Sequence, residues 1–335
     1  PSHLSASEAK AVEYSAPTRS PGSKAKSIER SAESIKKRIM HMEVKERPQE
    51  QPQIRPVFSL TDPPQNRVIL EANHFSFSYP DGRVIFKDAS FRLLRNSRTA
   101  LLGENGSGKT TLIRLIVEGE QIRKVPKARI GYHQQDLSTL NMGKSVLENA
   151  LETSIQSQTV VRTVLARLLF TAQDIQKPVS ALSGGERIRL SFARIFVSSA
   201  NVLILDEPTA GLDPKERIAI RNYIAELSRN KIILFATHVV SDIECIADYV
   251  LLLKKGEIIA MGTPVELIEK MHGKVAEITC TLDEVGKLQE KYHIGNIRQR
   301  KNGIALRLVG DELPDEAVMV DENIDLEDVY LYYFE

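Results

Sequence analysis

The chain contains 335 residues, of which 42% are apolar and 27% charged, and its 45 basic and 44 acidic side chains leave a formal net charge of +1. This length leaves room for about two domains, and the composition excludes a fibrous or wholly disordered protein. The even charge excludes a global attraction to nucleic acid. Two cysteines cannot build a disulfide framework or a four-ligand zinc site, so we expect a reducing, cytoplasmic environment.

The N-terminal part, residues 1–66, is rich in proline and poor in aromatic residues, which predicts a flexible linker. Residues 24–47 hold eight Lys/Arg and four Glu, with apolar residues near helical spacing, so a basic helix is expected there. A solvated helix and a helix that contacts nucleic acid both fit this pattern. The chain begins at Pro1 without the apolar stretch of a secretory signal, so we expect a fragment or trimmed product, and no apolar run is long enough to span a membrane.

Short strands and then alternating strands and helices follow from residue 67 onward. The expected strands are 68–72, 75–79, 84–86, 98–103, 202–206 and 231–236, and the expected helices are 108–118, 186–199 and 214–229. Strands that alternate with helices predict a domain with a parallel α/β sheet over 67–272. The helical pattern after Leu137 predicts an inserted helical lobe at about 137–200.

A small α+β domain is expected at 273–335. Its expected strands are 275–280, 294–299 and 302–308, and its expected helices are 283–292 and 325–334. The aromatic cluster at the chain's end, Tyr330, Tyr332, Tyr333 and Phe334, is expected to pack onto this domain rather than stack on a nucleotide. Cys245 and Cys280 lack neighbouring ligands and are expected to be partly buried, ordinary thiols.

A phosphate-binding loop, the Walker A pattern G-x-x-x-x-G-K-[ST], follows the apolar strand 99–102. Glycines let the backbone N–H groups face phosphate oxygens, and the next helix adds the positive end of its dipole. Lys109 is expected to bridge the β- and γ-phosphates, and the hydroxyl of Thr110 is expected to bind magnesium. The predicted nucleotide-binding residues of this segment are Gly103, Glu104, Asn105, Gly106, Ser107, Gly108, Lys109, Thr110 and Thr111.

Two further motifs point to the same chemistry. Asp206 and Glu207 end the apolar strand at 202–206, where Asp206 is placed to hold magnesium and Glu207 to act as general base toward the attacking water. The sequence LSGGE precedes a helix and predicts an anion-binding helix start, with the residues Leu182, Ser183, Gly184, Gly185 and Glu186.

The three motifs, in this order, resemble the ATP-binding cassette (ABC) superfamily. The resemblance implies an α/β fold, namely an ABC-type P-loop nucleotide-binding domain with an inserted helical lobe, here followed by a small C-terminal α+β appendage. It also implies that the protein binds MgATP and hydrolyses ATP. Because the LSGGE residues serve a partner's site in this family, it implies a second cassette, in a homodimer or heterodimer.

The resemblance assigns roles to four further residues. Tyr79 resembles the aromatic residue that stacks on adenine, although a strand aromatic in the core also fits. Gln135 resembles the glutamine that reaches magnesium and the attacking water, with Gln134 as the alternative. Asp213 resembles the dimer-interface aspartate and His238 the histidine that contacts the γ-phosphate. The implied magnesium ligands are Thr110, Gln135 and Asp206.

The finer resemblance divides the chain. Residues 24–209 resemble the second cassette of ABC-F translation or antibiotic-resistance factors, which act on the ribosome and tRNA. Residues 206–335 resemble the ATPase subunits of drug and bacteriocin ABC exporters, which drive a separate transmembrane permease at the inner face of the membrane. We expect an exporter subunit, because the sequence AGLD around Asp213 is of the exporter type. An ABC-F factor and a chimera of the two are the alternatives.

Overall fold

The computed structural model describes residues 62–119, 121–133, 137, 139–227, 231–300 and 303–334. Everything described below belongs to the unit Arg55–Glu335. The predicted linker helix at 24–47 lies outside the described residues.

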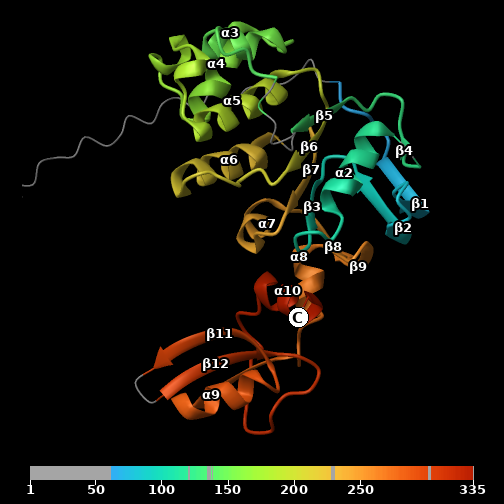
Figure 1. The fold of residues 1–335 in the computed structure, drawn as a ribbon, viewed down its shortest axis with the longest axis vertical. Coiled ribbons are helices and arrows are strands. Elements are labelled where there is room, and N and C mark those ends of the chain that lie inside the picture. Colours follow the sequence, from blue (N-terminus) through green and yellow to red (C-terminus); the bar gives the residue numbers. More distant parts are fainter. Residues whose placement is uncertain are drawn as a thin grey trace, which may run out of the picture. The chain divides into compact units, whose positions relative to one another are not determined.

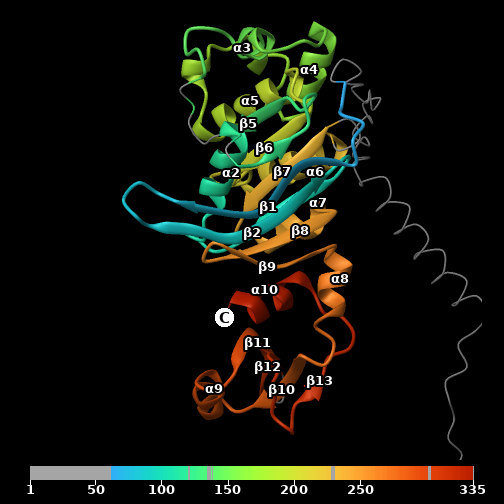
Figure 2. The ribbon, with the colours of Figure 1, turned by 90° about the vertical axis from the view of Figure 1, so that its right-hand side faces the viewer.

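A six-stranded sheet forms the centre of the fold, in the order β5-β6-β7-β3-β8-β9 (Figures 1 and 2). Its strands are β3 (Arg98–Leu102), β5 (Ile130–His133), β6 (Val202–Asp206), β7 (Ile232–Thr237), β8 (Tyr249–Lys254) and β9 (Glu257–Gly262). Five strands are parallel and β9 is antiparallel to β8, which confirms the predicted α/β class. Strands β6 and β7 are buried over their whole length because both faces of the sheet are covered.

Seven α-helices are described between β3 and the appendage. They are α2 (Lys109–Glu118), α3 (Val146–Glu152), α4 (Gln158–Arg167), α5 (Gly184–Val197), α6 (Pro214–Leu227), α7 (Val240–Ile246) and α8 (Pro264–Glu269). Helix α2 packs on one face of this sheet, while α5 and α6 pack on the other. Alternate residues of β7 enter different cores: Phe235 packs with α5 and α6, and Leu234 packs with α2. The helices α3, α4 and α5 gather in one group, where the helical lobe is expected (Figure 1).

The antiparallel sheet beside α2 differs from the prediction. Instead of three short strands, β1 (Val68–Ser78) and β2 (Val84–Leu94) form a long hairpin, with β4 (Arg123–Lys124) pairing along β1. The predicted break after residue 72 is a local irregularity in which His74 has a φ of 49°. Its N–H still bonds to the Ser90 hydroxyl on β2, at 2.8 Å, so pairing continues beyond it.

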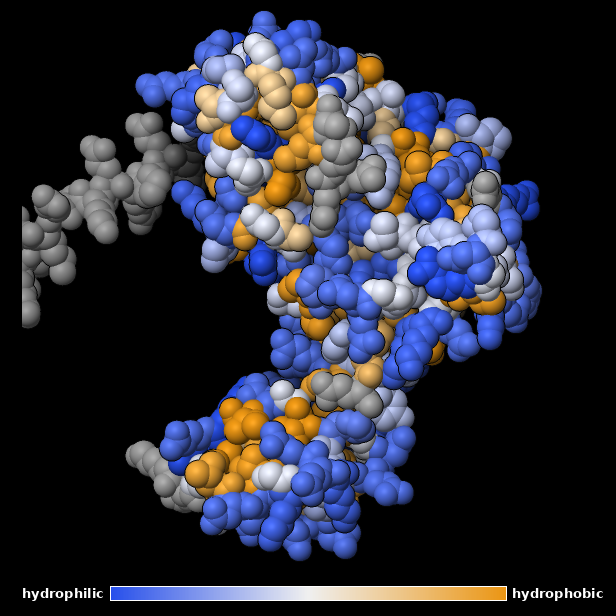
Figure 3. Space-filling model, in the orientation of Figure 1, coloured by the Kyte–Doolittle hydropathy of each residue, from blue (hydrophilic) through white to orange (hydrophobic). Residues whose placement is uncertain are grey.

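The C-terminal appendage contains a second antiparallel sheet, in the order β11-β12-β10-β13. Its elements are β10 (Val275–Cys280), α9 (Leu282–Gln289), β11 (His293–Arg300), β12 (Gly303–Val309), β13 (Val318–Met319) and α10 (Leu326–Phe334). All the predicted elements are present, and the two-residue β13 is additional. Apolar side chains gather on the face of the appendage that Figure 3 shows, around β11 and β12.

The C-terminal aromatic cluster and the two cysteines were predicted to have no part in a functional site. Phe334 is buried and its ring stacks on that of Tyr330, with 4.5 Å between centroids, so this part of the aromatic cluster packs as expected. The two cysteines differ from the prediction of partial burial, because Cys245 is exposed and Cys280 is buried at the end of β10. The boundary at residue 273 stays a prediction.

The central sheet allows a test of packing. Phe235 is 0% exposed, and replacing it with alanine removes most of a ring from a core that cannot fully collapse. We expect Phe235→Ala to lower the free energy of unfolding by about 3–5 kcal/mol, measured by urea denaturation. The control Ile218→Ala, on the exposed side of α6, is expected to change it by less than about 1 kcal/mol. Equal effects of the two variants would contradict the assignment of this core.

Candidate nucleotide-binding site

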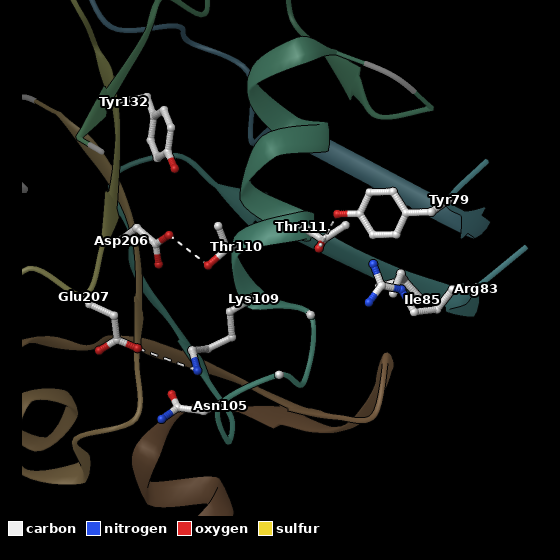
Figure 4. A pocket seen from close by; sticks show the side chains of 12 residues that line it. Tyr79, Arg83, Ile85, Asn105, Lys109, Thr110, Thr111, Tyr132, Asp206 and Glu207 are labelled. Atoms are coloured by element: carbon white, nitrogen blue, oxygen red, sulfur yellow. Dashed lines mark hydrogen bonds and ion pairs between the residues drawn. The ribbon is translucent and has the colours of Figure 1, made fainter. Parts of the chain in front are cut away.

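A cavity of about 570 Å³ opens at the carboxyl ends of the parallel strands, beside the β1–β2 hairpin (Figure 4). Four parts of the chain contribute to it: the hairpin, the predicted phosphate loop, β5 and the end of β6. Its lining residues are Tyr79, Arg83, Ile85, Asn105, Gly106, Gly108, Lys109, Thr110, Thr111, Tyr132, Asp206 and Glu207. The structure therefore brings Tyr79, the phosphate loop and the two β6 acids to one site, as the sequence predicted.

The phosphate loop connects β3 to α2 through backbone conformations that need glycine. Gly106 and Gly108 have φ values of 81° and 109°, in the left-handed region. A Cβ atom on Gly103 would lie 2.4 Å from the Leu253 carbonyl oxygen, so only glycine fits there. No side chain caps the N-terminus of α2, which leaves its first N–H groups available to an anion.

Lys109 lies across this loop and is only 6% exposed. Its ammonium donates to the carbonyl oxygens of Gly103, at 2.7 Å, and Glu104, at 3.0 Å. It also lies 3.6 Å from Oε1 of Glu207 (Figure 4). Burial lowers the pKa of Lys109, while the charges of Glu207 and Asp206 oppose that shift. The cation is therefore held between the loop and the β6 acids, where a phosphate group would meet it.

Thr110 and Asp206 form a pair that suits magnesium. The Thr110 hydroxyl donates to Oδ2 of Asp206 at 3.0 Å, and Oδ1 of Asp206 is buried with no hydrogen-bond partner. Burial raises the pKa of Asp206, because the carboxylate is costly to keep charged there. A hydroxyl and a carboxylate oxygen are ligands that Mg²⁺ prefers, and a cation would satisfy the unpaired oxygen. The residues present therefore fit the ion.

Glu207 contacts both Lys109 of the phosphate loop and the residues at the end of β7. Its φ is 45°, a left-handed conformation that is strained for a residue with a side chain, and its N–H donates to the Ala236 carbonyl at 2.9 Å. One carboxylate oxygen lies 3.0 Å from Nδ1 of His238, and the other is buried without a hydrogen bond. The His238 side chain is 48% exposed. The two residues predicted to be catalytic thus contact each other.

Tyr79 lies at the hairpin end of the cavity. Its hydroxyl is 3.1 Å from the Thr111 hydroxyl, and the guanidinium groups of Arg83 and Arg114 lie 5.0 and 5.2 Å from its ring centroid. The ring is half-buried and lines the cavity, so it is not a buried core residue, and its role in stacking stays a prediction. Arg83 and Tyr132 also line the cavity and were not predicted, because each enters it only through tertiary packing.

The LSGGE residues lie apart from this cavity: among the described residues that line it, none belongs to 182–186. Ser183 caps α5, since its hydroxyl accepts the Glu186 N–H at 3.2 Å while the Glu186 carboxylate accepts the Ser183 N–H at 2.7 Å. A Cβ atom at Gly184 would meet no atom within 4 Å, so this surface is open. The expectation that these residues serve a partner's site stays a prediction.

Asp213 begins α6 and Glu216 links that helix to α5. Oδ1 of Asp213 accepts the Glu216 N–H at 2.8 Å, and the Glu216 carboxylate lies 2.9 Å from Arg189 of α5. Asp213 is exposed, and its role at a dimer interface stays a prediction. The link through Glu216 holds Asp213 and the LSGGE helix as neighbours.

Gln134 and Gln135 lie outside the described residues, so the choice between them stays open. The residue before them, His133, was not predicted and is buried. Its Nε2 atom lies 2.8 Å from the Ser191 hydroxyl of α5, and its ring stacks on Phe192 at 3.8 Å. The end of β5 is thereby tied to the LSGGE helix.

Comparison with known proteins identifies the family. The family model described as ABC transporter matches residues 86–210. The Nod factor export ATP-binding protein I of Rhizobium johnstonii is 34% identical over 229 residues, which cover 62% of this chain and 73% of the relative. The chain belongs to the ABC transporter family. As a member of this ABC family it is an ATP-binding ATPase.

Two further similarities describe this ABC chain. The ATP-binding protein Uup of Escherichia coli is 39% identical over 143 residues, covering 40% of this chain and 22% of Uup, which supports the ABC-F resemblance. The solved structure of cbiO1 from Clostridium perfringens, part of the ABC transporter complex cbiONQ, has a TM-score of 0.52 and 27% identity. It covers 67% of this chain, and all of cbiO1 is matched. In the described part of the chain, no helix is long and apolar enough to cross a membrane.

The buried histidine predicts acid sensitivity. Burial lowers the pKa of His133 from 6.5 to about 4, so the folded chain keeps this imidazole neutral where the unfolded chain protonates it. Its contribution to stability is complete above the unfolded pKa and is lost as pH falls toward the folded pKa. Between about pH 7.5 and about pH 5, we expect this group alone to cost about 2 kcal/mol.

The measurement is urea unfolding of wild type and His133→Gln at both pH values. The variant is expected to lose about 2 kcal/mol less than wild type on acidification, because glutamine does not titrate. His272→Gln, at an exposed position, is the control and is expected to behave as wild type. Identical pH profiles for wild type and His133→Gln would show that His133 is not held neutral.

Proposed function

We propose that this chain is the ATP-binding subunit of an ABC exporter, which binds MgATP and hydrolyses it to drive a separate transmembrane permease. The observation that carries the proposal is the convergence of Lys109, Asp206 and Glu207 on one cavity that Tyr79 also lines. The match over 73% of the Nod factor export protein and the exporter-like sequence of residues 206–335 support the exporter role.

Each residue of the site has a part in this proposal. Tyr79 stacks on the adenine, the N–H groups at the start of α2 bind phosphate oxygens, and Lys109 leaves its loop carbonyls to bridge the β- and γ-phosphates. Thr110 and Asp206 hold Mg²⁺, which neutralises phosphate charge when bound.

Glu207 and His238 act at the γ-phosphate. Oε1 of Glu207, which makes no hydrogen bond, accepts a proton from the attacking water, and His238 orients that carboxylate through its contact with the other oxygen at 3.0 Å. The strained backbone at Glu207 holds the carboxylate toward the cavity. General-base catalysis of this kind contributes about 10²–10⁴-fold in rate.

A second cassette completes the site in this proposal, as a homodimer or heterodimer. Ser183 and Gly184 lie on an open surface away from their own cavity, and Asp213 is exposed beside them through the Glu216 link. We propose that these residues face the phosphate groups held by the partner cassette. The subunit then works at the cytoplasmic face of the membrane, with 67–272 as its nucleotide-binding domain and 273–335 as its appendage.

Glu207→Gln tests the catalytic assignment. An amide keeps the shape of the carboxylate but cannot take a proton from water, so we expect ATP turnover to fall by about 100-fold or more. ATP affinity, measured by isothermal titration, is expected to stay within about threefold, and the variant is expected to accumulate as an ATP-bound dimer in light scattering.

Lys109→Ala is the matched comparison, because it removes the buried cation and is expected to abolish tight MgATP binding. A fall in turnover of less than about tenfold for Glu207→Gln, which is about 1.4 kcal/mol of barrier, would exclude Glu207 as the principal base. Undiminished affinity of Lys109→Ala would exclude the phosphate-loop assignment.

The second candidate is an ABC-F factor that acts on the ribosome, favoured by the match to Uup and by the eight basic residues at 24–47. Three or four engaged cations would make binding to ribosomes depend on salt with a slope of about −2 to −4. For an exporter subunit we expect weak, equal and salt-insensitive ribosome binding by the full chain and by a chain lacking residues 1–60. Such a slope in the full chain alone, at constant ATP, would favour the ABC-F function.

A further inference from the structure

The C-terminal helix α10 joins the appendage to the cassette at both of its ends. At its start, the Leu326 N–H donates to the Glu244 carboxylate of α7 at 3.4 Å. At its end, the carbonyl oxygen of Tyr333 accepts a hydrogen bond from the Lys254 ammonium at 2.8 Å, and the same ammonium lies 5.9 Å from the Phe334 ring centroid. A cation is favourable there, because the last carbonyl groups of a helix carry partial negative charge.

The same helix is held firmly to the appendage. Arg307 of β12 donates two hydrogen bonds, each 2.7 Å long, to the two carboxylate oxygens of Asp328 in the first turn of α10. The Asp328 side chain is buried, so this bidentate pair is shielded from solvent. Movement of the appendage sheet therefore moves α10 with it.

Lys254 ends β8, and the turn that follows it lies against the phosphate loop. The Gly256 N–H donates to the Ser107 carbonyl oxygen at 3.0 Å. The turn has no free space, because a Cβ atom on Gly256 would lie 1.6 Å from the carbonyl oxygen of Ile85, a residue that lines the nucleotide cavity. Leu253, the residue before Lys254, also lies against the phosphate loop, because a Cβ atom on Gly103 would lie 2.4 Å from its carbonyl oxygen.

These contacts form a continuous connection from α10 through Lys254 and Gly256 to Ser107. We propose that the appendage and the phosphate loop are energetically coupled through Lys254, so that docking of α10 and binding of ATP stabilise each other. Lys254 is then a positioning residue for the nucleotide site, although it does not line it. The coupling is reciprocal by thermodynamic necessity, so any partner that binds the appendage also changes ATP affinity. The proposal rests on the proposed ATP site.

The first experiment compares ATP affinity of four variants of the full chain by isothermal titration. Lys254→Met removes the ammonium but keeps the length of the side chain, and we expect the Kd for ATP to rise about fivefold, at the lower end of common coupling factors. Lys254→Arg keeps a cation that reaches the Tyr333 carbonyl and is expected to restore the affinity within about twofold. Lys255→Met is the matched control at the neighbouring exposed lysine, for which the described residues show no ion pair or hydrogen bond.

Lys109→Ala, the fourth variant, separates the two proposals. If wild type binds ATP no better than Lys109→Ala, the ATP site itself is wrong. If wild type binds ATP and Lys254→Met binds it equally well, the site stands and the coupling is excluded. A loss of affinity that Lys254→Arg does not restore, or that Lys255→Met shares, also excludes the specific role of Lys254.

The second experiment needs no substitution to be informative. Hydrogen exchange of wild type is followed with and without ATP, and we expect ATP to slow exchange in α10 by about fivefold. Because the coupling is reciprocal, this equals the factor by which Lys254→Met is expected to weaken ATP binding. Exchange in α9, on the other face of the appendage sheet, is expected to stay unchanged, and the effect in α10 is expected to disappear in Lys254→Met. No change in α10 exchange when wild type binds ATP overturns the proposal.

Discussion

The parallel pairing of β3, β7 and β6 is the constraint on which the site depends. Leu102 pairs with Thr237, and Asp206 pairs with Ala236, so the three strands end at one edge of the sheet. The phosphate loop, the β6 acids and His238 each follow one of these ends. Parallel strands need helical crossovers, which place α2 and its N–H groups at the same edge. The register of the sheet thereby gathers residues that lie up to 135 positions apart in the chain, from Gly103 to His238.

The site then depends on a balance of buried charges. Lys109 is shielded from water between loop carbonyl groups and Glu207, and Asp206 is buried beside the Thr110 hydroxyl with one oxygen unsatisfied. Burial shifts the pKa of Lys109 downward and that of Asp206 upward, so each group gains from a ligand that supplies opposite charge. Such an arrangement is a site prepared for a polyanion with a divalent cation, and it is less favourable without them.

Much of this site was predictable from sequence because its signals are local. Gly103–Lys109 needs a left-handed backbone and a helix start, and Asp206 follows a run of fully apolar residues, so both features are visible without tertiary structure. The long β1–β2 hairpin was not predictable, because the irregularity at His74 is compensated only by the Ser90 hydroxyl of another strand. Arg83 and His133 were missed for the same reason: each acts through a contact with Tyr79 or Ser191 that folding creates.

The two glycines of LSGGE differ in their surroundings, and that difference determines what a substitution at each can report. A side chain at Gly184 would project into open space, whereas one at Gly185 would lie 2.7 Å from the Glu216 carboxylate. That carboxylate pairs with Arg189 and joins α5 to α6. A defect caused by alanine at position 185 therefore mixes a blocked surface with a displacement of the Glu216 carboxylate beside Arg189. Only position 184 isolates the surface that the LSGGE helix offers to another molecule.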